Sequence, residues 1–134
     1  MPETFQLRTQ PLVAFLATLD PERARRFYGE TLGLPLISDE APFALMFDAH
    51  GTMLRVTTVR EMSAAPYTVL GWHVTGGIAE AVKALQQAGI RFQIYEGMQQ
   101  DELGIWTAPG GAAKVAWFKD PDGNVLSISE NAVV

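Results

Sequence analysis

The chain has 134 residues, a formal net charge of −5 and no cysteine; we expect one domain with a sizeable core, without disulfides, thiolate nucleophiles or Cys-ligated metals. The acidic balance, with no basic cluster beyond Arg23, Arg25 and Arg26, argues against a nucleic-acid partner. No apolar run approaches about 18 residues and no signal-peptide pattern opens the chain, which predicts a soluble cytoplasmic protein without membrane contact.

The first half of the chain alternates strand-like and helix-like segments. The run "LVAFLATL", residues 12–19, has the length and composition of a strand. Asp20 and Pro21 then supply an N-cap and the favoured first helical residue, and Gly33 is placed to end that helix. Three further strands are predicted at residues 34–38, 43–48 and 52–59, with a turn at His50 and Gly51 between the last two.

The second half repeats this order. Residues 60–66 are small and polar, as in a linker, and residues 67–74 have strand composition. A second helical stripe follows and is closed by Gly89. Strands are then predicted at residues 91–96, 113–118 and 124–129, the last two joined by a "DPDGN" turn. The sequence therefore predicts an α+β fold of two βαβββ modules, at about 8–60 and 66–134, within a single domain.

A long connection interrupts the second module. Residues 97–111 are about twice as long as most connections in compact domains. Because Ile105 and Trp106 need burial, we interpret this segment as a lid and Trp106 as the residue that covers a ligand. A disordered hairpin is the alternative interpretation.

The segments "LDPERARRFYGETLGLPL", "QQAGI" and "WFKDPDGNVLSISE" together resemble the vicinal oxygen chelate superfamily of glyoxalases, bleomycin resistance proteins and extradiol dioxygenases. The resemblance covers nearly the whole chain. It implies that the two modules form a curved mixed sheet around a cleft, with the helices on the outer face. It also implies a homodimer.

Metal-dependent members of that superfamily carry one metal ligand on each of four strands. The resemblance places the corresponding positions at Val13, Arg55, Ser127 and, in the fifth strand, Val69 or Leu70. Divalent zinc, nickel, iron and manganese need imidazole, carboxylate or thiolate donors, which none of these residues provides. We therefore expect no metal and no other cofactor. The hydroxyl of Ser127 suits a hydrogen bond to an organic ligand instead.

The chain has two histidines, His50 in a predicted turn and His73 in the predicted strand 67–74. We expect them to lie far apart, which disfavours a second kind of metal site. If Leu70 and Trp72 pack under the second helix, strand alternation points Val69 and His73 into the cleft. His73 is then the one candidate for a general acid or base. A histidine bonded to the backbone is the alternative, and a register slip of one residue would move it under the helix.

Arg55 should also face the cleft, together with Met53 and Thr57, and a guanidinium in such a place needs a partner. That partner is either a carboxylate of the chain or an anionic group of a ligand, unless Arg55 lies exposed at a sheet edge. The candidate carboxylates are Asp48, Glu96, Asp101 and Glu102. The last two also sit near the lid, where a general base or a solvated loop explains them.

Aromatic side chains are numerous enough to line an apolar pocket. Strand parity places Phe15 inward beside Val13, whereas Phe27 and Trp72 should belong to the core between helices and sheet. The predicted ligand-binding residues are Val13, Phe15, Arg55, Val69, His73, Trp106 and Ser127.

Three functions are compatible with these residues. The leading hypothesis is a metal-independent small-molecule-binding protein of the glyoxalase/bleomycin resistance type, with an unidentified small organic ligand. The alternative is a lyase or isomerase of glyoxalase type, with His73 and Arg55 as a catalytic pair or with a metal bound by other residues. A third is a subunit whose dimer surface is its purpose. The sequence leaves open whether the protein is an enzyme, and whether the two modules of one chain face each other or exchange partners between chains.

Overall fold

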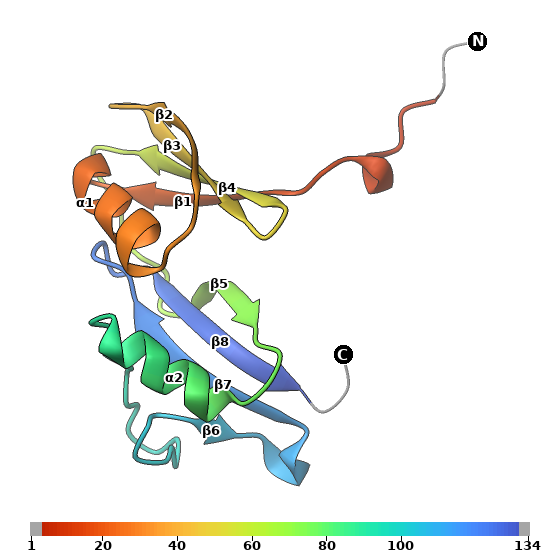
Figure 1. Ribbon diagram of the computed structural model, residues 1–134, viewed down its shortest axis with the longest axis vertical. Helices are drawn as coiled ribbons and strands as arrows, with labels where there is room; N and C mark the ends of the chain where they lie inside the picture. Colours follow the sequence, from red (N-terminus) through yellow and green to blue (C-terminus); the bar gives the residue numbers. More distant parts are fainter. Residues whose placement is uncertain (1–3, 132–134) are drawn as a thin grey trace.

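The structure is a computed structural model that describes residues 4–131. It contains two four-stranded sheets, drawn one above the other in Figure 1. Sheet A has the order β1-β4-β3-β2 and consists of β1 (Val13–Thr18), β2 (Leu36–Glu40), β3 (Ala44–Ala49) and β4 (Thr52–Thr58). Sheet B has the order β5-β8-β7-β6 and consists of β5 (Thr68–His73), β6 (Trp106–Thr107), β7 (Ala113–Lys119) and β8 (Val125–Asn131).

One helical segment packs on each sheet. Helix α1 (Pro21–Arg25) continues into the wider π-helical turn η2 (Arg26–Thr31), and helix α2 (Ile78–Gln87) belongs to the second module. The Asp20 carboxylate accepts a hydrogen bond from the Arg23 backbone N–H (3.1 Å), so this residue caps α1 as expected. Short 3₁₀ turns occur at η1 (Leu7–Thr9) and η3 (Pro109–Gly111). The order βαβββ occurs twice, which confirms the predicted α+β fold.

One predicted strand is wrong. Residues 91–96 make only an isolated bridge to Phe118, and the edge strand of sheet B is the two-residue β6 instead. The side chain of Gln100 explains this difference. Its Nε2 donates to the carbonyl of Gln93 (2.9 Å) and its Oε1 accepts from the N–H of Tyr95 (2.7 Å). A side-chain amide thus takes the hydrogen bonds that a neighbouring strand would have made.

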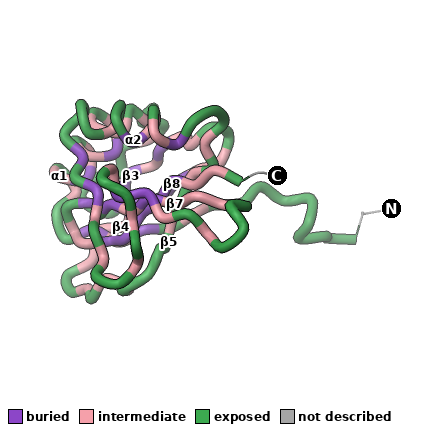
Figure 2. Tube along the Cα trace, turned by 90° about the horizontal axis from the view of Figure 1, so that it is seen from below, coloured by how far each residue is buried: buried purple, intermediate pink, exposed green. Residues whose placement is uncertain are grey.

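The core is continuous across both modules. Strands β3, β4, β7 and β8 carry half of the buried residues of the core cluster, and Figure 2 shows buried residues in purple. Phe27, from η2, and Trp72, from β5, pack against this core, as predicted. The fully buried side chains of greatest volume are Tyr28, Phe47, Phe118, Leu45, Leu54, Leu126, Val56, Val82 and Thr18.

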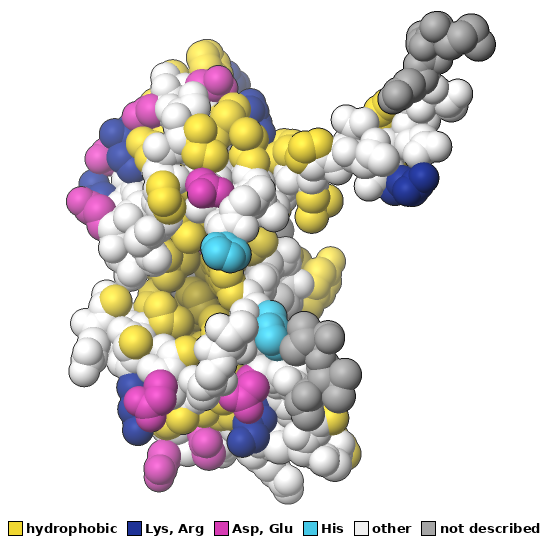
Figure 3. Space-filling model, turned by 45° about the vertical axis from the view of Figure 1, so that its right-hand side comes forward, with side chains coloured by type: hydrophobic (Ala, Val, Ile, Leu, Met, Phe, Trp, Pro, Cys, Tyr) yellow, Lys and Arg dark blue, Asp and Glu magenta, His cyan; other side chains and the backbone are white. Residues whose placement is uncertain are grey.

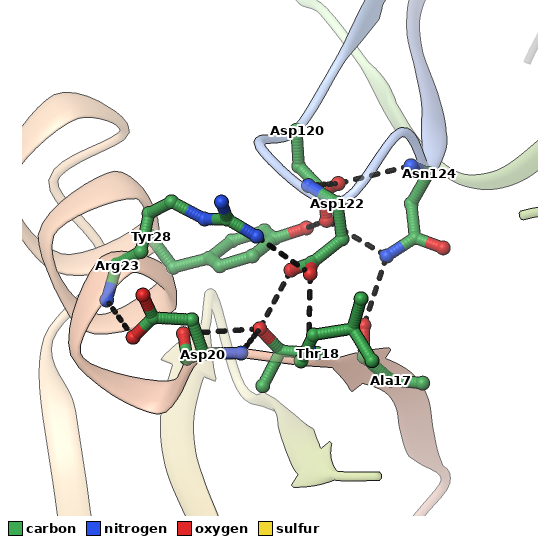
Figure 4. Close-up of polar contacts among 9 residues, drawn as sticks. Ala17, Thr18, Asp20, Arg23, Tyr28, Asp120, Asp122 and Asn124 are labelled. Atoms are coloured by element: carbon green, nitrogen blue, oxygen red, sulfur yellow. Dashed lines mark hydrogen bonds and ion pairs between the residues drawn. The ribbon is translucent and has the colours of Figure 1, made fainter. Parts of the chain in front are cut away.

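The turn between β7 and β8 joins the second module to the first through a buried carboxylate, Asp120 (Figure 4). The Tyr28 hydroxyl donates to Asp120 Oδ2 across a gap of 2.5 Å. Asn124 Nδ2 donates to the same oxygen (2.8 Å), and the N–H groups of Asp122 and Asn124 donate to Asp120 Oδ1 (2.9 Å each). Burial and the neighbouring Asp120 charge raise the pKa of Tyr28, so the phenol stays protonated and donates.

A second carboxylate of the same turn, Asp122, extends the connection. It accepts hydrogen bonds from Thr18 Oγ1 (2.6 Å), the Leu19 N–H (2.9 Å) and Arg23 Nη2 (3.0 Å). Asn124 Nδ2 also reaches the carbonyl of Ala17 (3.1 Å). The "DPDGN" segment is therefore more than a turn between two strands, because its polar groups bond to β1 and to the helix after it.

Candidate ligand-binding site

Sheet A has one face packed in the core and one open face. Leu16, Leu54 and Val56 belong to the core, so the alternate residues of β1 and β4 point the other way. On that open face Val13 pairs with Met53 and Phe15 pairs with Arg55. Phe15 is 65% exposed and Val13 is 37% exposed, although both are apolar. The register thus brings three predicted site residues, Val13, Phe15 and Arg55, onto one apolar surface.

Arg55 has a partner within the chain, and it is not one of the four carboxylates expected from the sequence. Its Nη1 lies 3.9 Å from Glu40 Oε1 and 4.0 Å from Met46 Sδ. Arg55 is opposite Met46 in the next strand, and Glu40 comes from β2, one strand farther. The guanidinium therefore extends along the open face over Met46. A half-exposed pair at this distance is weak, which leaves Arg55 free to meet an anion.

Sheet B also has a face turned away from the core. Ser127 is on that face and is 9% exposed, so little of it reaches solvent. Ser127 pairs with Gly71 on β5 and with Trp117 on β7, while its neighbours Leu126 and Ile128 enter the core. A Cβ atom at position 71 would lie 2.7 Å from Ser127 Oγ. Glycine at position 71 therefore lets the hydroxyl lie against the strand backbone. Val69, two residues earlier on β5, is 41% exposed.

Three aromatic rings form a cluster on the second module, and one of them, Trp117, is opposite Ser127 in the neighbouring strand. The ring centroids of Trp106 and Trp117 are 6.3 Å apart, and those of Tyr95 and Trp117 are 5.7 Å apart at 77°. All three side chains are half-buried. Such edge-to-face and tilted contacts leave ring faces available for stacking. Trp106 thus belongs to strand β6 at the edge of sheet B and contacts Trp117, which is opposite Ser127.

The segment 97–111 is an ordered loop held by its own side chains. Gln100 Nε2 donates to the Gly104 carbonyl (2.7 Å) in addition to its contacts with the segment before it. Asp101 Oδ1 accepts from the N–H groups of Leu103 and Ile105 (2.9 Å each), and Ile105 is buried in the core. The Asp101 carboxylate therefore shapes the turn, which removes the reason to regard it as a general base.

The sequence predicted that the two histidines lie far apart. In the structure both line one pocket between the modules. His73 is the last residue of β5 and His50 is in the β3–β4 turn. The stacking of the modules brings that turn towards the end of β5. The other predicted ligand-binding residues do not line this pocket.

The four positions that the resemblance assigned to metal ligands do not fit a divalent cation here. Val13 and Arg55 are on sheet A, and Val69 and Ser127 are on sheet B. None provides an imidazole, carboxylate or thiolate. Throughout residues 4–131, no three side chains of His, Asp or Glu are grouped so that they could hold a metal ion.

Sequence reasoning missed two sets of residues. The sequence analysis did not predict that Tyr28, Asp120 and Asp122 connect the modules. A signal was present, because the turn has two carboxylates and its backbone needs only one. The pairing of Arg55 with Glu40 was missed as well, because it depends on β2 lying next to β3 and two strands away from β4. Strand order is not readable from periodicity.

Comparison with known proteins adds the family. A family model described as Glyoxalase/Bleomycin resistance protein/Dioxygenase superfamily matches residues 10–128. The chain belongs to this superfamily. The resemblance drawn from its motifs is thereby confirmed. A search of curated proteins finds no match.

Solved structures of the superfamily share the fold at low sequence identity. Lactoylglutathione lyase from Agrobacterium tumefaciens is 16% identical, with a TM-score of 0.70 over 91% of this chain and 93% of that one. A glyoxalase/bleomycin resistance protein/dioxygenase from Nocardioides is 20% identical, with a TM-score of 0.67 over 95% and 86%. A glyoxalase family protein from Enterococcus faecalis is 19% identical, with a TM-score of 0.65 over 90% and 94%. No helix within residues 4–131 is long and apolar enough to cross a membrane.

Proposed function

We propose that the protein is a metal-independent small-molecule-binding member of the superfamily. The observation that carries this proposal is the chemistry of the four ligand positions, where hydrocarbon, guanidinium and hydroxyl groups replace metal donors. Arg55 and Ser127 remain as polar anchors among exposed apolar side chains. Binding sites for organic molecules have this composition, an apolar lining with a few placed polar groups.

The proposed active form is a homodimer. A compact monomer of 14.7 kDa exposes about 6,900 Å² of surface, whereas this chain exposes 8808 Å². The excess is larger than the roughly 800 Å² that each partner buries in a standard interface. Part of it comes from residues 4–12, which run away from both sheets in Figure 1 with Phe5 70% exposed. A second copy would cover apolar surface that one chain leaves open.

Each cleft of this dimer combines the open face of sheet A from one subunit with the open face of sheet B from the other. The reason is the position of the Asp120 connection, which ties the β7–β8 turn to β1 and α1. The helix-covered faces of both sheets share the core of one chain. The open faces therefore point away from that core and need a second subunit to close over a ligand.

The enzyme alternative receives less support from the geometry. Catalysis by His73 would benefit from a carboxylate that orients the imidazole. His73 is exposed at the end of β5, and the ion pairs found among residues 4–131 do not include it. Binding is therefore the first proposal and lyase or isomerase activity the second.

Two measurements test the proposal. Elemental analysis of purified protein should find no stoichiometric zinc, nickel, iron or manganese, and stoichiometric metal would overturn metal independence. A thermal-shift screen of small organic compounds should give ligands that stabilise the protein, since a ligand at about 100 times its dissociation constant adds about 2.7 kcal/mol. Stabilisation should disappear in Arg55→Ala and in Ser127→Val, but not in Lys83→Ala, which alters an exposed residue of α2.

Mixed dimers test the architecture of the cleft. In a dimer of one Arg55→Ala and one Ser127→Val subunit, one cleft carries both substitutions and the other carries neither. Such a dimer should regain half of the sites by calorimetry. If each cleft were built within one chain, mixing would restore no binding, and a monomer in sedimentation that binds fully would overturn the dimer proposal.

A further inference from the structure

A pocket separate from the two open faces lies between the modules. Its volume is about 580 Å³, within the range of small-molecule sites. In Figure 3 it appears as a hollow floored by hydrophobic side chains between the upper and lower parts of the molecule. The lining residues from the first module are Leu32, Leu34, Ala49 and His50. Those from the second module are Trp72, His73, Val74, Thr75, Ala81, Ala84, Leu85, Phe118 and Ile128.

The position of this inter-module pocket sets it apart from the proposed cleft. Leu85, Phe118 and Ile128 belong to the helix-covered side of sheet B and to the core region around it. Ser127 and Trp117 point to the opposite side of the same sheet. A molecule in the pocket would therefore be separated from a molecule in the cleft by the thickness of the sheet.

The walls of the pocket are almost entirely apolar. Helix α2 contributes Ala81 and Ala84, whose small side chains leave space beside Leu85. Leu32 and Leu34 approach from the opposite module and are half-buried. No lysine, arginine or acidic side chain is part of the lining. The body of a suitable ligand is therefore a hydrocarbon chain or a flat ring system.

The exceptions to this apolar lining are Thr75 and the two histidines of the chain. His50 comes from the β3–β4 turn of the first module and His73 from the end of β5 in the second. Figure 3 shows the two imidazoles, in cyan, on opposite sides of the hollow. Each imidazole has an N–H that can donate a hydrogen bond even when the ring is neutral. A ligand group that accepts from both sides at once would join the two modules.

We propose that the inter-module pocket binds a medium-chain carboxylate, with its hydrocarbon body over α2 and its carboxylate between His50 and His73. A carboxylate has two oxygens and accepts from two donors simultaneously. The volume admits such a molecule, and the absence of lysine or arginine from the lining selects a single small head group over a phosphate. A metal ion between the histidines is not favoured, since no third donor joins them within residues 4–131.

The three tryptophans of the chain allow a direct test. Trp72 lines the pocket, whereas Trp106 and Trp117 are in contact on the open face of sheet B. The double variant Trp106→Phe/Trp117→Phe leaves Trp72 as the sole tryptophan reporter, and Trp72→Phe leaves the other two. Titration with decanoate, below the concentration at which it forms micelles, should change the emission of the first variant saturably and leave the second unchanged.

Variants of the lining sharpen the result. Ala84→Leu fills the pocket from α2 and should weaken decanoate binding at least tenfold, whereas Gln86→Leu adds the same side chain to the same helix outside the lining and should not. His50→Ala and His73→Ala should each weaken decanoate about tenfold, the effect of losing one hydrogen bond to a charged group. Decanol, which lacks the carboxylate, should bind more weakly to the unaltered protein and respond little to either substitution. Circular dichroism and urea unfolding check that each variant is folded.

Several outcomes would overturn this proposal. A decanoate response from Trp106 and Trp117 but not from Trp72 would place the molecule on the open face, which supports the cleft and rejects the pocket. No response from Trp72 at millimolar decanoate, or equal affinity in Ala84→Leu, would also reject it. Equal affinity for decanol and decanoate would reject the role of the histidines. A response confined to Trp72 does not argue against ligands in the proposed cleft, because Trp106 and Trp117 report on that site separately.

Discussion

The turn before the last strand is equivalent in the two modules, but it is exposed in the first module, whereas its carboxylate is buried in the second. The β3–β4 turn contains His50 and Gly51, both with positive φ (51° and 95°), and is exposed at the rim of the inter-module pocket. The Asp48 carboxylate accepts one hydrogen bond there, from the Gly51 N–H (2.8 Å). In the β7–β8 turn the Asp120 carboxylate accepts from two backbone N–H groups and two side chains, and is 5% exposed.

The two turns share one local arrangement, and they show how burial changes what it requires. In both turns an aspartate satisfies the N–H groups of the tight bend. Only the carboxylate of the second turn is buried against the other module. Its oxygens therefore need side-chain donors in addition to the N–H groups of the turn. The first turn carries no such constraint, and its histidine is free to border a pocket. One module therefore supplies the connection and the other supplies part of a binding wall.

The largest expected effect breaks the buried turn. Asp120→Ala leaves the Tyr28 hydroxyl, the Asn124 amide and two N–H groups without their acceptor, and should lower the free energy of unfolding by roughly 4 kcal/mol. The matched variant Asp48→Ala removes the equivalent carboxylate of the other module and should cost about 1 kcal/mol. Urea denaturation measures both. Similar losses for the two variants would show that the inter-module hydrogen bonds contribute little.

The residue pairs at the centres of the two open faces also differ between the modules. Sheet A has Phe15 opposite Arg55, whereas the equivalent pair of sheet B is Gly71 opposite Ser127. A Cβ at position 71 would meet Ser127 Oγ at 2.7 Å and Ser127 O at 3.3 Å. Gly71→Ala should therefore destabilise the protein by roughly 2 kcal/mol.

The second substitution Ser127→Ala removes the closer of these two contacts. The double variant should recover at least half of the loss in unfolding free energy that Gly71→Ala causes. Thermal and urea unfolding of the two single variants and the double variant give the coupling between them. Strictly additive losses would mean that the backbone contact, and not the hydroxyl, is what requires glycine.

A smaller effect appears at high pH through Tyr28. Burial and the Asp120 charge raise the pKa of this phenol in the folded state. The folded protein therefore keeps a proton that the unfolded chain loses above about pH 10. The stability that this proton contributes is complete below that pH and declines as the pH rises, by up to about 1.4 kcal/mol per pH unit.

The variant Tyr28→Phe should lose about 1.5 kcal/mol at pH 8 with the hydrogen bond, and its unfolding free energy should decline less steeply than that of the unaltered protein above pH 10. Tyr67→Phe, at a residue 67% exposed, is the control and should preserve the steep decline. Urea unfolding at a series of pH values measures the two slopes. Parallel curves for Tyr28→Phe and the unaltered protein would show that this phenol does not govern the alkaline loss.

The sequence predicted what depends on local pattern. The N-cap at Asp20, the helix-ending glycines and the alternation that separates Phe15 from Leu16 follow from the periods of helices and strands. It did not predict the failure of residues 91–96 to form a strand, since that depends on where the Gln100 amide comes to lie. The placement of His50 and His73 in the lining of one pocket was also beyond its reach, because it results from how the modules stack.

The start of each helix gives the finest test of the comparison between modules. Helix α1 is capped by its own neighbour Asp20, whereas α2 begins after Gly77 and receives its cap from β8, where Glu130 Oε1 accepts from the Ile78 N–H (3.0 Å). A cap contributes about 1 kcal/mol in either case. Asp20→Ala and Glu130→Ala should therefore lower the free energy of unfolding similarly. They should differ in hydrogen exchange, because Asp20 holds only its own helix turn, whereas Glu130 also ties α2 to the last strand. Glu130→Ala should speed exchange at the amides of both α2 and β8, while Asp20→Ala should speed it in α1 alone. If Glu130→Ala affects α2 but not β8, Glu130 acts only as a cap of its helix.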